Sequence, residues 1–151
     1  MLLCLGGCNK AVAPTFKAVG VREVQQEGDR SVIEFLIEAT NPNRDPLPLR
    51  QVHYTVRLDD QDVFSGVRSP ETTLHTYSSH VFELPAVLEL GSFSGTGIVN
   101  YTIVGTVQYI PPGQLSEVLF DAEIKVPEAV LNLSGTINTG DTKTGDANRT
   151  D

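Results

Sequence analysis

The sequence predicts an all-β fold, an antiparallel β-sandwich of seven short strands. Apolar and polar residues alternate along most of the chain, and this period of two residues is typical of strands that bury one face. Turn-forming residues separate these segments at regular spacing, and no segment has the pattern of an amphipathic helix of ordinary length. The chain has 151 residues, of which 40% are hydrophobic, so it suits one domain with a sizeable core.

The first two predicted strands span residues 15–24 and 31–40. In the second strand every other residue from Ile33 to Ala39 is apolar, and the residues between them include two glutamates. Gly28 and its acidic neighbours are expected to close a hairpin between the two strands.

The third and fourth predicted strands span residues 51–58 and 62–69, with an acidic hairpin turn at residues 59–62. A loop that contains two prolines, residues 41–46, precedes the third strand. The third strand has the clearest alternation of all. Its apolar residues are Val52, Tyr54, Val56 and Leu58.

The last three predicted strands span residues 78–84, 97–109 and 117–126. The longest of them places five large apolar residues on one face: Val99, Tyr101, Ile103, Val107 and Tyr109. Residues 86–90 and 114–119 lie beside prolines, and each segment could form about one turn of helix.

From residue 134 onward the composition changes to Gly, Thr, Asp and Asn, with almost no residue to bury. A segment of this composition cannot offset the entropy of ordering its backbone. We therefore predict a folded domain over residues 15–133 and a disordered polar tail over residues 134–151.

The composition also excludes several classes of function. The formal net charge is −8, so the surface repels phosphates, and nucleic acids are not expected partners. No stretch reaches the roughly 20 apolar residues of a transmembrane helix. Cys4 and Cys8 are the only cysteines, so the domain has no disulfide, no cysteine-ligated metal and no thiol nucleophile. We expect a monomer.

Residues 5–8 read Leu-Gly-Gly-Cys and resemble the lipobox of bacterial lipoproteins. In that class the cysteine receives a diacylglyceryl group, the preceding peptide is removed, and the cysteine becomes the first mature residue. The resemblance implies lipidation of Cys8, with residues 1–8 as a truncated lipoprotein signal and residues 9–14 as a tether. The membrane would then be a partner through this lipid, because two acyl chains suffice for stable anchoring.

The leader departs from a complete signal peptide, which has basic residues and an apolar run of about 7–15 residues. Only five residues precede the two glycines, and none is Lys or Arg. Either the true start lies upstream, or the motif is accidental. Its position directly before a tether and a strand-rich domain favours the lipoprotein interpretation. If sorting follows the enteric rule, Asn9 implies the periplasmic face of the outer membrane.

A longer resemblance runs through residues 15–127. One strand ends in Asn-Pro-Asn, an apolar Leu follows, the next strand has a central Tyr, and an acidic hairpin and a Gly come after it. A later strand has the pattern Tyr-x-x-x-Gly. The residues that carry these features are Asn41, Pro42, Asn43, Tyr54, Gly66, Tyr101 and Gly105. Their order and spacing resemble the late-embryogenesis-abundant group 2 family (LEA type 2), also described as the water-stress and hypersensitive-response (WHy) domain.

The resemblance implies a seven-stranded sandwich that is immunoglobulin/fibronectin-III-like, although the Cys…Trp…Cys pattern of immunoglobulins is absent. Bacterial members of the family often look like envelope lipoproteins, which agrees with Cys8. We interpret the motif residues as structural. Pro42 removes a hydrogen-bond donor at a strand end, the tyrosines bury their rings, and Gly105 indicates a bulge or a close contact.

The chain offers no catalytic or metal-binding constellation. His75 and His80 are five residues apart, which does not place both on one face of a strand. The aspartates of the 59–62 turn lack the glycine and the distal carboxylate of a calcium loop. Residues 91–95 have Phe where the nucleophile of a Gly-x-Ser-x-Gly elbow would be. We therefore expect a protein that is not an enzyme and that uses no metal and no cofactor.

Two functions remain open at this point. The first is a non-enzymatic, lipid-anchored envelope protein that protects or binds protein clients during desiccation and water stress. The alternative is an adaptor or accessory lipoprotein that docks to an envelope complex through a sheet face or through residues 91–97.

Overall fold

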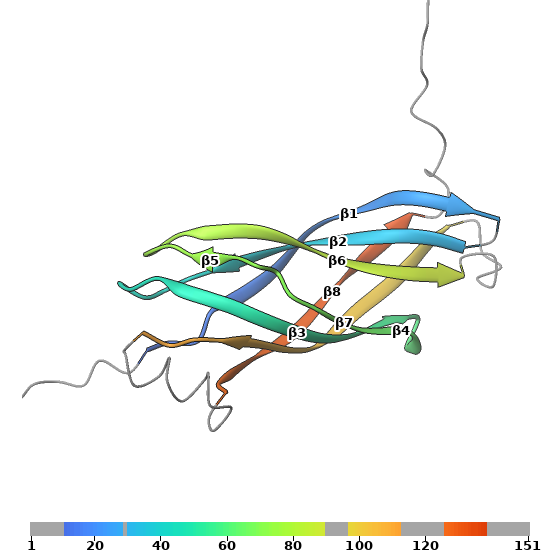
Figure 1. Cartoon of the computed structure of the whole chain (residues 1–151). Helices are drawn as coiled ribbons and strands as arrows, with labels where there is room; N and C mark the ends of the chain where they lie inside the picture. Colours follow the sequence, from blue (N-terminus) through green and yellow to red (C-terminus); the bar gives the residue numbers. More distant parts are fainter. Residues whose placement is uncertain (1–10, 29, 90–96, 113–125, 139–151) are drawn as a thin grey trace, which may run out of the picture.

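A computed structural model describes residues 11–28, 30–89, 97–112 and 126–138. Within these residues the chain forms eight strands and no helix (Figure 1). The strands are β1 (Thr15–Glu27), β2 (Arg30–Thr40), β3 (Leu47–Leu58), β4 (Gln61–Arg68), β5 (Thr73–Leu74), β6 (Ser79–Glu89), β7 (Ile98–Tyr109) and β8 (Glu128–Asn138).

The strands form two sheets in which every pairing is antiparallel. One sheet has the order β1-β2-β6, and the other has the order β4-β3-β7-β8, with the short β5 paired to the start of β3. Side chains from both sheets meet in one hydrophobic core, for example Phe35 of β2 and Tyr101 of β7, whose ring centroids are 4.9 Å apart. The all-β prediction with two antiparallel sheets is therefore confirmed.

Burial alternates along the strands as the sequence predicts. In β2 the residues from Ile33 to Ala39 that face inward are at most 2% exposed. The apolar residues predicted for β3 and β7 are buried as well. Burying a large aliphatic side chain contributes about 1.5–3 kcal/mol, so these three strands account for much of the driving force for folding.

Both predicted hairpin turns are present. Gly28 follows β1 with a φ of 61°, a left-handed conformation that glycine adopts without steric cost. Asp59 and Asp60 join β3 to β4 with φ values of 45° and 67°. Positive φ at both central residues is typical of the type I′ turn, whose twist matches that of the flanking strands.

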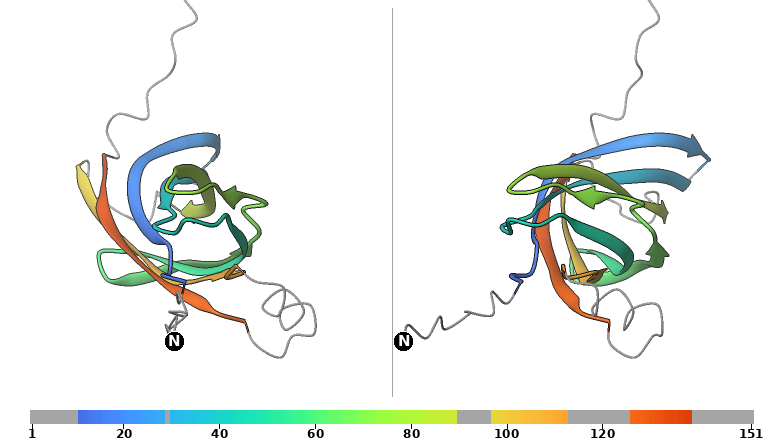
Figure 2. Two further views of the ribbon diagram at one scale, coloured as in Figure 1. Left: turned by 90° about the vertical axis from the view of Figure 1, so that its left-hand side faces the viewer. Right: turned by 60° about the vertical axis from the view of Figure 1, so that its left-hand side comes forward.

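Strand β1 curves strongly along its length (Figure 2). Its pairing with β2 shifts register between Ala18 and Gly20 and again between Glu23 and Gln25. Such bulges bend a strand and increase its twist. The bend brings β1 close to β8 of the other sheet.

The structure corrects the prediction at four places. Within the described residues the strands number eight: six of the seven predicted strands are present, and β5 and β8 were not predicted. The last strand is β8, at residues 128–138, and most of the predicted strand 117–126 lies outside the described residues. Residues 134–138 belong to β8, so the predicted tail begins too early, and residues 139–151 lie outside the described residues.

Residues 86–89 continue β6 rather than forming helix, and residues 114–119 are not described. The immunoglobulin/fibronectin-III-like topology stays a prediction.

The boundary at residue 134 was misplaced for a physical reason. Polar residues such as Ser134 and Thr136 lie on the exposed face of β8, while Ile137 is buried on the other. Gly135 lies opposite Tyr101 of β7, and the tyrosine ring occupies the space that a Cβ would need. This polar, Gly-containing segment is therefore ordered because β7 pairs with it along its length and because the Tyr101 ring packs against Gly135.

Candidate functional site

Asn41 is completely buried at the end of β2 and links two segments of the chain. Its amide nitrogen donates to the carbonyl oxygens of Asp45 (2.9 Å), Leu74 (3.2 Å) and His75 (3.1 Å). Its Oδ1 accepts hydrogen bonds from the backbone and side-chain nitrogens of Asn43, both at 2.9 Å. The side chain thus joins the loop of residues 41–46 to the segment that leads from β5 into β6.

Asn43 fastens the start of the described chain to the same loop. The backbone nitrogen of Val12 donates to Oδ1 of Asn43 (2.8 Å), and Nδ2 of Asn43 donates to the carbonyl of Val12 (2.7 Å). One side chain therefore satisfies both backbone groups of Val12. The segment that precedes β1 is held at this end of the sandwich.

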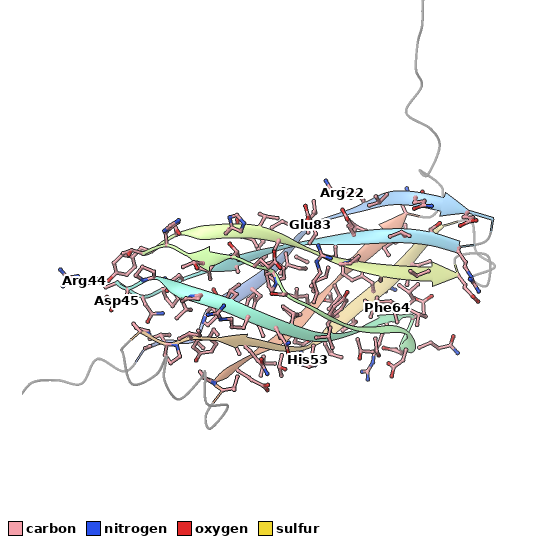
Figure 3. The ribbon with its side chains drawn as sticks, viewed as in Figure 1. Arg22, Arg44, Asp45, His53, Phe64 and Glu83 are labelled. Atoms are coloured by element: carbon pink, nitrogen blue, oxygen red, sulfur yellow. The ribbon has the colours of Figure 1, made fainter. Side chains whose placement is uncertain are left out.

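Tyr77 lies at the same end and is 69% exposed. Its backbone nitrogen donates to the carbonyl of Asn43 (3.1 Å), and the Thr76 hydroxyl donates to the carbonyl of Arg44 (2.7 Å). The φ of Tyr77 is 48°, which is rare for a bulky residue. We call the group Val12, Asn43, Arg44 and Tyr77 the Asn43 end. Figure 3 shows Arg44 and its neighbour Asp45 at this tip of the molecule.

Tyr54 connects the two sheets at the centre of the domain. Its hydroxyl donates to the carbonyl of Pro85 in β6 at 2.5 Å, and its ring lies 5.8 Å from that of Phe64. In the register it is paired with Gly66 on one side and with Gly105 on the other. The three motif residues Tyr54, Gly66 and Gly105 are therefore brought together, although they are far apart in sequence.

Burial raises the pKa of the Tyr54 hydroxyl to about 12, against a smaller opposing effect of the Arg68 charge. Burial also raises the pKa of Tyr101. In both cases the neutral hydroxyl is favoured in the folded protein, because the phenolate would lose hydration.

This shift predicts a loss of stability at alkaline pH. The Tyr54 hydroxyl would lose its proton near pH 10 in the unfolded chain and near pH 12 in the folded protein. Its contribution is complete below pH 10 and should decline as the pH rises toward 12. We expect Tyr54→Phe to lower the free energy of unfolding by about 1 kcal/mol at pH 7, through the lost bond to Pro85, and to flatten the alkaline decline.

Urea unfolding at pH 7, 9, 10 and 11 measures both effects. Tyr77→Phe removes an exposed hydroxyl and should keep the wild-type stability at each pH. An equally steep alkaline decline in Tyr54→Phe and in the wild type would contradict the assignment to Tyr54.

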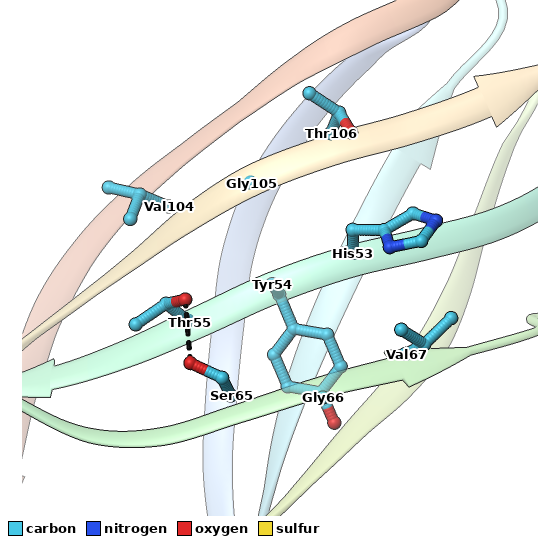
Figure 4. A pocket seen from close by; sticks show the side chains of 9 residues that line it. All are labelled: His53, Tyr54, Thr55, Ser65, Gly66, Val67, Val104, Gly105 and Thr106. Atoms are coloured by element: carbon cyan, nitrogen blue, oxygen red, sulfur yellow. Dashed lines mark hydrogen bonds between the residues drawn. The ribbon is translucent and has the colours of Figure 1, made fainter.

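A shallow depression of ≈ 530 Å³ lies on the outer face of the five-stranded sheet, over β4, β3 and β7 (Figure 4). Short side chains and glycines make up most of its lining, and the Thr55 and Ser65 hydroxyls are hydrogen-bonded at 2.9 Å. The lining residues are His53, Tyr54, Thr55, Ser65, Gly66, Val67, Val104, Gly105 and Thr106. A depression this open does not enclose a small molecule on most sides, as ligand pockets do.

A smaller cleft of ≈ 210 Å³ lies between β4 and β6. Each of them is an edge strand of its sheet, and the two edges face each other. Arg68 and Pro85 lie at this cleft. Arg68 is paired with the inward-facing Val52, so it directs a charge toward the open side of the sandwich. An inward-pointing charge such as Arg68 in β4, and a proline such as Pro85 in β6, both disfavour the pairing of an edge strand with another chain.

The titratable residues that the sequence singled out are not brought together. His53 lies in the outer depression, His75 lies next to Asn41, and His80 is at the start of β6, and all three are exposed. Asp59 instead accepts a hydrogen bond from the Asn100 backbone (3.3 Å). Within the described part of the chain, no group of three or more His, Cys, Asp or Glu side chains is placed to hold a metal ion.

Charged side chains cross the outer face of the three-stranded sheet. Arg22 of β1 contacts Glu34 of β2 at 2.6 Å and Glu83 of β6 at 3.1 Å, which raises the pKa of the guanidinium (Figure 3). Because the arginine is exposed, this ion pair contributes little to stability. It does tie the three strands together on a hydrated surface.

The predicted lipidation site falls outside the described residues, as do residues 1–10 in general. Among the residues that the structure describes, no helix is long and apolar enough to cross a membrane. The predicted loop at residues 91–95 also lies outside the described residues.

Sequence reasoning missed two residues of interest. Tyr77 occurs in a polar segment without strand alternation, and an aromatic residue in such a segment is a signal that could have been used. Gly135 gave no signal, because its importance depends on lying opposite Tyr101.

Comparisons with known proteins agree with this fold. A solution structure of a protein from Arabidopsis thaliana aligns with a TM-score of 0.63 at 12% identity, over 86% of this chain and 86% of that one. A solution structure of a candidate late embryogenesis abundant (LEA) protein gives 0.61 at 13% identity, over 85% and 74%. A crystal structure of a protein from Archaeoglobus fulgidus gives 0.54 at 13% identity, over 83% and 98%. No curated protein matches the chain.

At such low identity the likeness to solved structures shows the fold alone. The family of type 2 late embryogenesis abundant proteins matches residues 36–126, which is more than half of the chain. The matched segment includes all seven motif residues, from Asn41 to Gly105. The protein therefore belongs to the late embryogenesis abundant type 2 family.

Proposed function

We propose that this protein is a non-enzymatic, lipid-anchored protein of the bacterial cell envelope that protects other macromolecules during water stress. Family membership is the observation that carries the proposal. The anchor rests on the lipobox-like sequence at Cys8.

The surface suggests how protection would work. The net charge is −8, and the outer sheet faces carry charged and hydroxyl side chains such as Arg22, Glu34 and Thr55. A folded, acidic and well-hydrated surface keeps itself soluble as water is lost. Transient contacts through it would separate unfolded client proteins and slow their aggregation.

Protection can be tested by drying a client enzyme with the full chain. We expect the client to retain at least twofold more activity after rehydration than with an equal mass of an unrelated acidic globular protein. Equal loss of activity with the two proteins would contradict a protective role.

The anchor needs a separate test in bacterial cells. Radiolabelled palmitate should be incorporated into the chain, expressed behind a complete signal segment, and Cys8→Ser should abolish the label. Cys4→Ser is the matched control, because this residue lies in the part that processing would remove. Label that persists in Cys8→Ser would contradict lipidation at this residue.

A specific feature favours the adaptor alternative. Val67 is 60% exposed in the ≈ 530 Å³ depression, which also exposes part of Val104. If one envelope protein docks there, crosslinking in envelopes should recover it in stoichiometric amount. Val67→Asp should then abolish recovery, whereas Val24→Asp, at a 54% exposed position of β1 in the other sheet, should not.

A further inference from the structure

The tether is too short to let the domain turn freely at a membrane. Cys8 precedes Val12 by four residues, and a fully extended chain spans at most about 3.6 Å per residue. A lipid on Cys8 would therefore hold Val12 within roughly 14 Å of the bilayer surface. The two hydrogen bonds between Val12 and Asn43 extend this restraint to the loop of residues 41–46.

The Asn43 end presents an aromatic ring on a rigid support. The turn that carries Tyr77 is held by bonds from Tyr77 to Asn43, from Thr76 to Arg44, and from Asn41 to the carbonyl of Ser78 (2.9 Å). Tyr77 adopts a left-handed backbone conformation that a glycine or asparagine would tolerate better. A strained residue that keeps a 69% exposed ring indicates a use for the ring outside the fold.

Tyrosine is suited to the boundary between headgroups and water, because its ring is apolar and its hydroxyl is polar. Val12 adds a second apolar side chain to this end, with 58% of its surface exposed. Arg44 is exposed beside them and can contact lipid phosphates.

Several exposed carboxylates lie at the other end of the molecule, whereas Asp45 stands beside Arg44 at the Asn43 end. Strands β1, β3 and β6 all start near the Asn43 end, and each of them ends at carboxylates. These are Glu27 at the end of β1, Asp59 and Asp60 after β3, and Glu89 at the end of β6. Strand β3 alone has 12 residues, a length of about 40 Å, so these charges are far from the Asn43 end.

We propose that the Asn43 end faces the membrane and that Tyr77 and Val12 contact the lipid headgroup layer. The acidic hairpins then point away from the bilayer toward the aqueous compartment. This orientation rests on the proposed anchor at Cys8, and the experiment below attaches the chain chemically so that the two ideas are tested apart.

The chain has no Trp, so a single introduced Trp reports on one position. The full chain with Cys4→Ser can be coupled through Cys8 to vesicles of phosphatidylcholine that contain about 2% maleimide lipid. Three reporters are compared: Tyr77→Trp and Val12→Trp at the Asn43 end, and Ile98→Trp at the far end. Ile98 is 71% exposed and is paired with Asn138.

Brominated phosphatidylcholine should quench the fluorescence of Trp at positions 77 and 12 at least twofold, with almost no quenching at position 98. Without coupling, in the Cys8→Ser chain, no position should be quenched. Equal quenching at positions 77 and 98, or none at positions 77 and 12 in the coupled chain, would overturn the orientation. Because attachment is chemical, such a result would leave the palmitate test of Cys8 unaffected, and a negative palmitate test would not alter the vesicle result.

Discussion

Gly105→Ala is expected to destabilise the sandwich by about 3 kcal/mol, at the upper end of the range for overpacked sites. A Cβ at this position would lie 1.9 Å from the carbonyl oxygen of His53 and 2.9 Å from the Cα of Tyr54. These are backbone atoms of β3, so they cannot rotate away. Strands β3 and β7 would have to separate at the centre of the sheet. Gly105→Val adds two further carbons and is expected to prevent folding.

Urea unfolding of the full chain, followed by circular dichroism, measures this effect. Gly97→Ala is the matched control, because a Cβ there meets nothing within 4 Å, and its stability should change by less than about 0.5 kcal/mol. Gly135→Ala should fall between the two, since the atoms it meets belong to the Tyr101 side chain, which can shift. A Gly105→Ala variant as stable as Gly97→Ala would show that the close approach of β3 and β7 is not required.

Asn41→Ala is expected to cost about 3 kcal/mol. The substitution removes the donor to three carbonyl oxygens, those of Asp45, Leu74 and His75, and a buried carbonyl without a partner costs about 1 kcal/mol or more. It also frees Asn43, whose side chain holds Val12. The loss should therefore loosen the start of β1 as well as the loop.

Asn41→Asp separates hydrogen bonding from packing. Aspartate has nearly the same shape, but an ionised carboxylate cannot donate to the three carbonyls. We expect a loss of stability at least as large as for alanine. Asn132→Ala, at an exposed position of β8, is the control and should change the free energy of unfolding by less than about 0.5 kcal/mol. If Asn41→Asp were as stable as the wild type, the hydrogen bonds would not be the reason for this buried asparagine.

Much of the fold could be predicted from local pattern. Strands β2, β3 and β7 each bury one face, and a period of two residues in the sequence translates directly into that arrangement. The hairpin at Asp59 and Asp60 was predictable, because these residue types tolerate positive φ.

Other elements could not be predicted in this way. Strand β5 has two residues, which is too short for any periodicity. Residues 134–138 look like a tail by composition, and only the pairing with β7 makes them a strand. Residues 86–89 extend β6 because β2 offers partners along its whole length, which outweighs a weak helical preference.

The candidate site was likewise predictable only in part. Asn41, Tyr54 and Gly105 were recognised as motif residues, yet their partners could not be named, because Leu74, Pro85 and the His53 carbonyl come from distant segments. Tyr77 was not recognised at all, since neither its exposure nor its left-handed backbone is a property of sequence.

The sequence by itself determined the all-β class, the inward faces of the main strands, the two hairpin turns and the family. These depend on side-chain polarity and on the conformational preferences of single residues, which are local. Tertiary structure alone decided that Tyr54 lies between two glycines, that Asn41 joins the loop of residues 41–46 to the segment before β6, and that Val12, Arg44 and Tyr77 share one end. Apart from the pairing of Tyr54 with the nearby Gly66, those contacts join residues about 30 or more positions apart, and they arise only when the two sheets close around a common core.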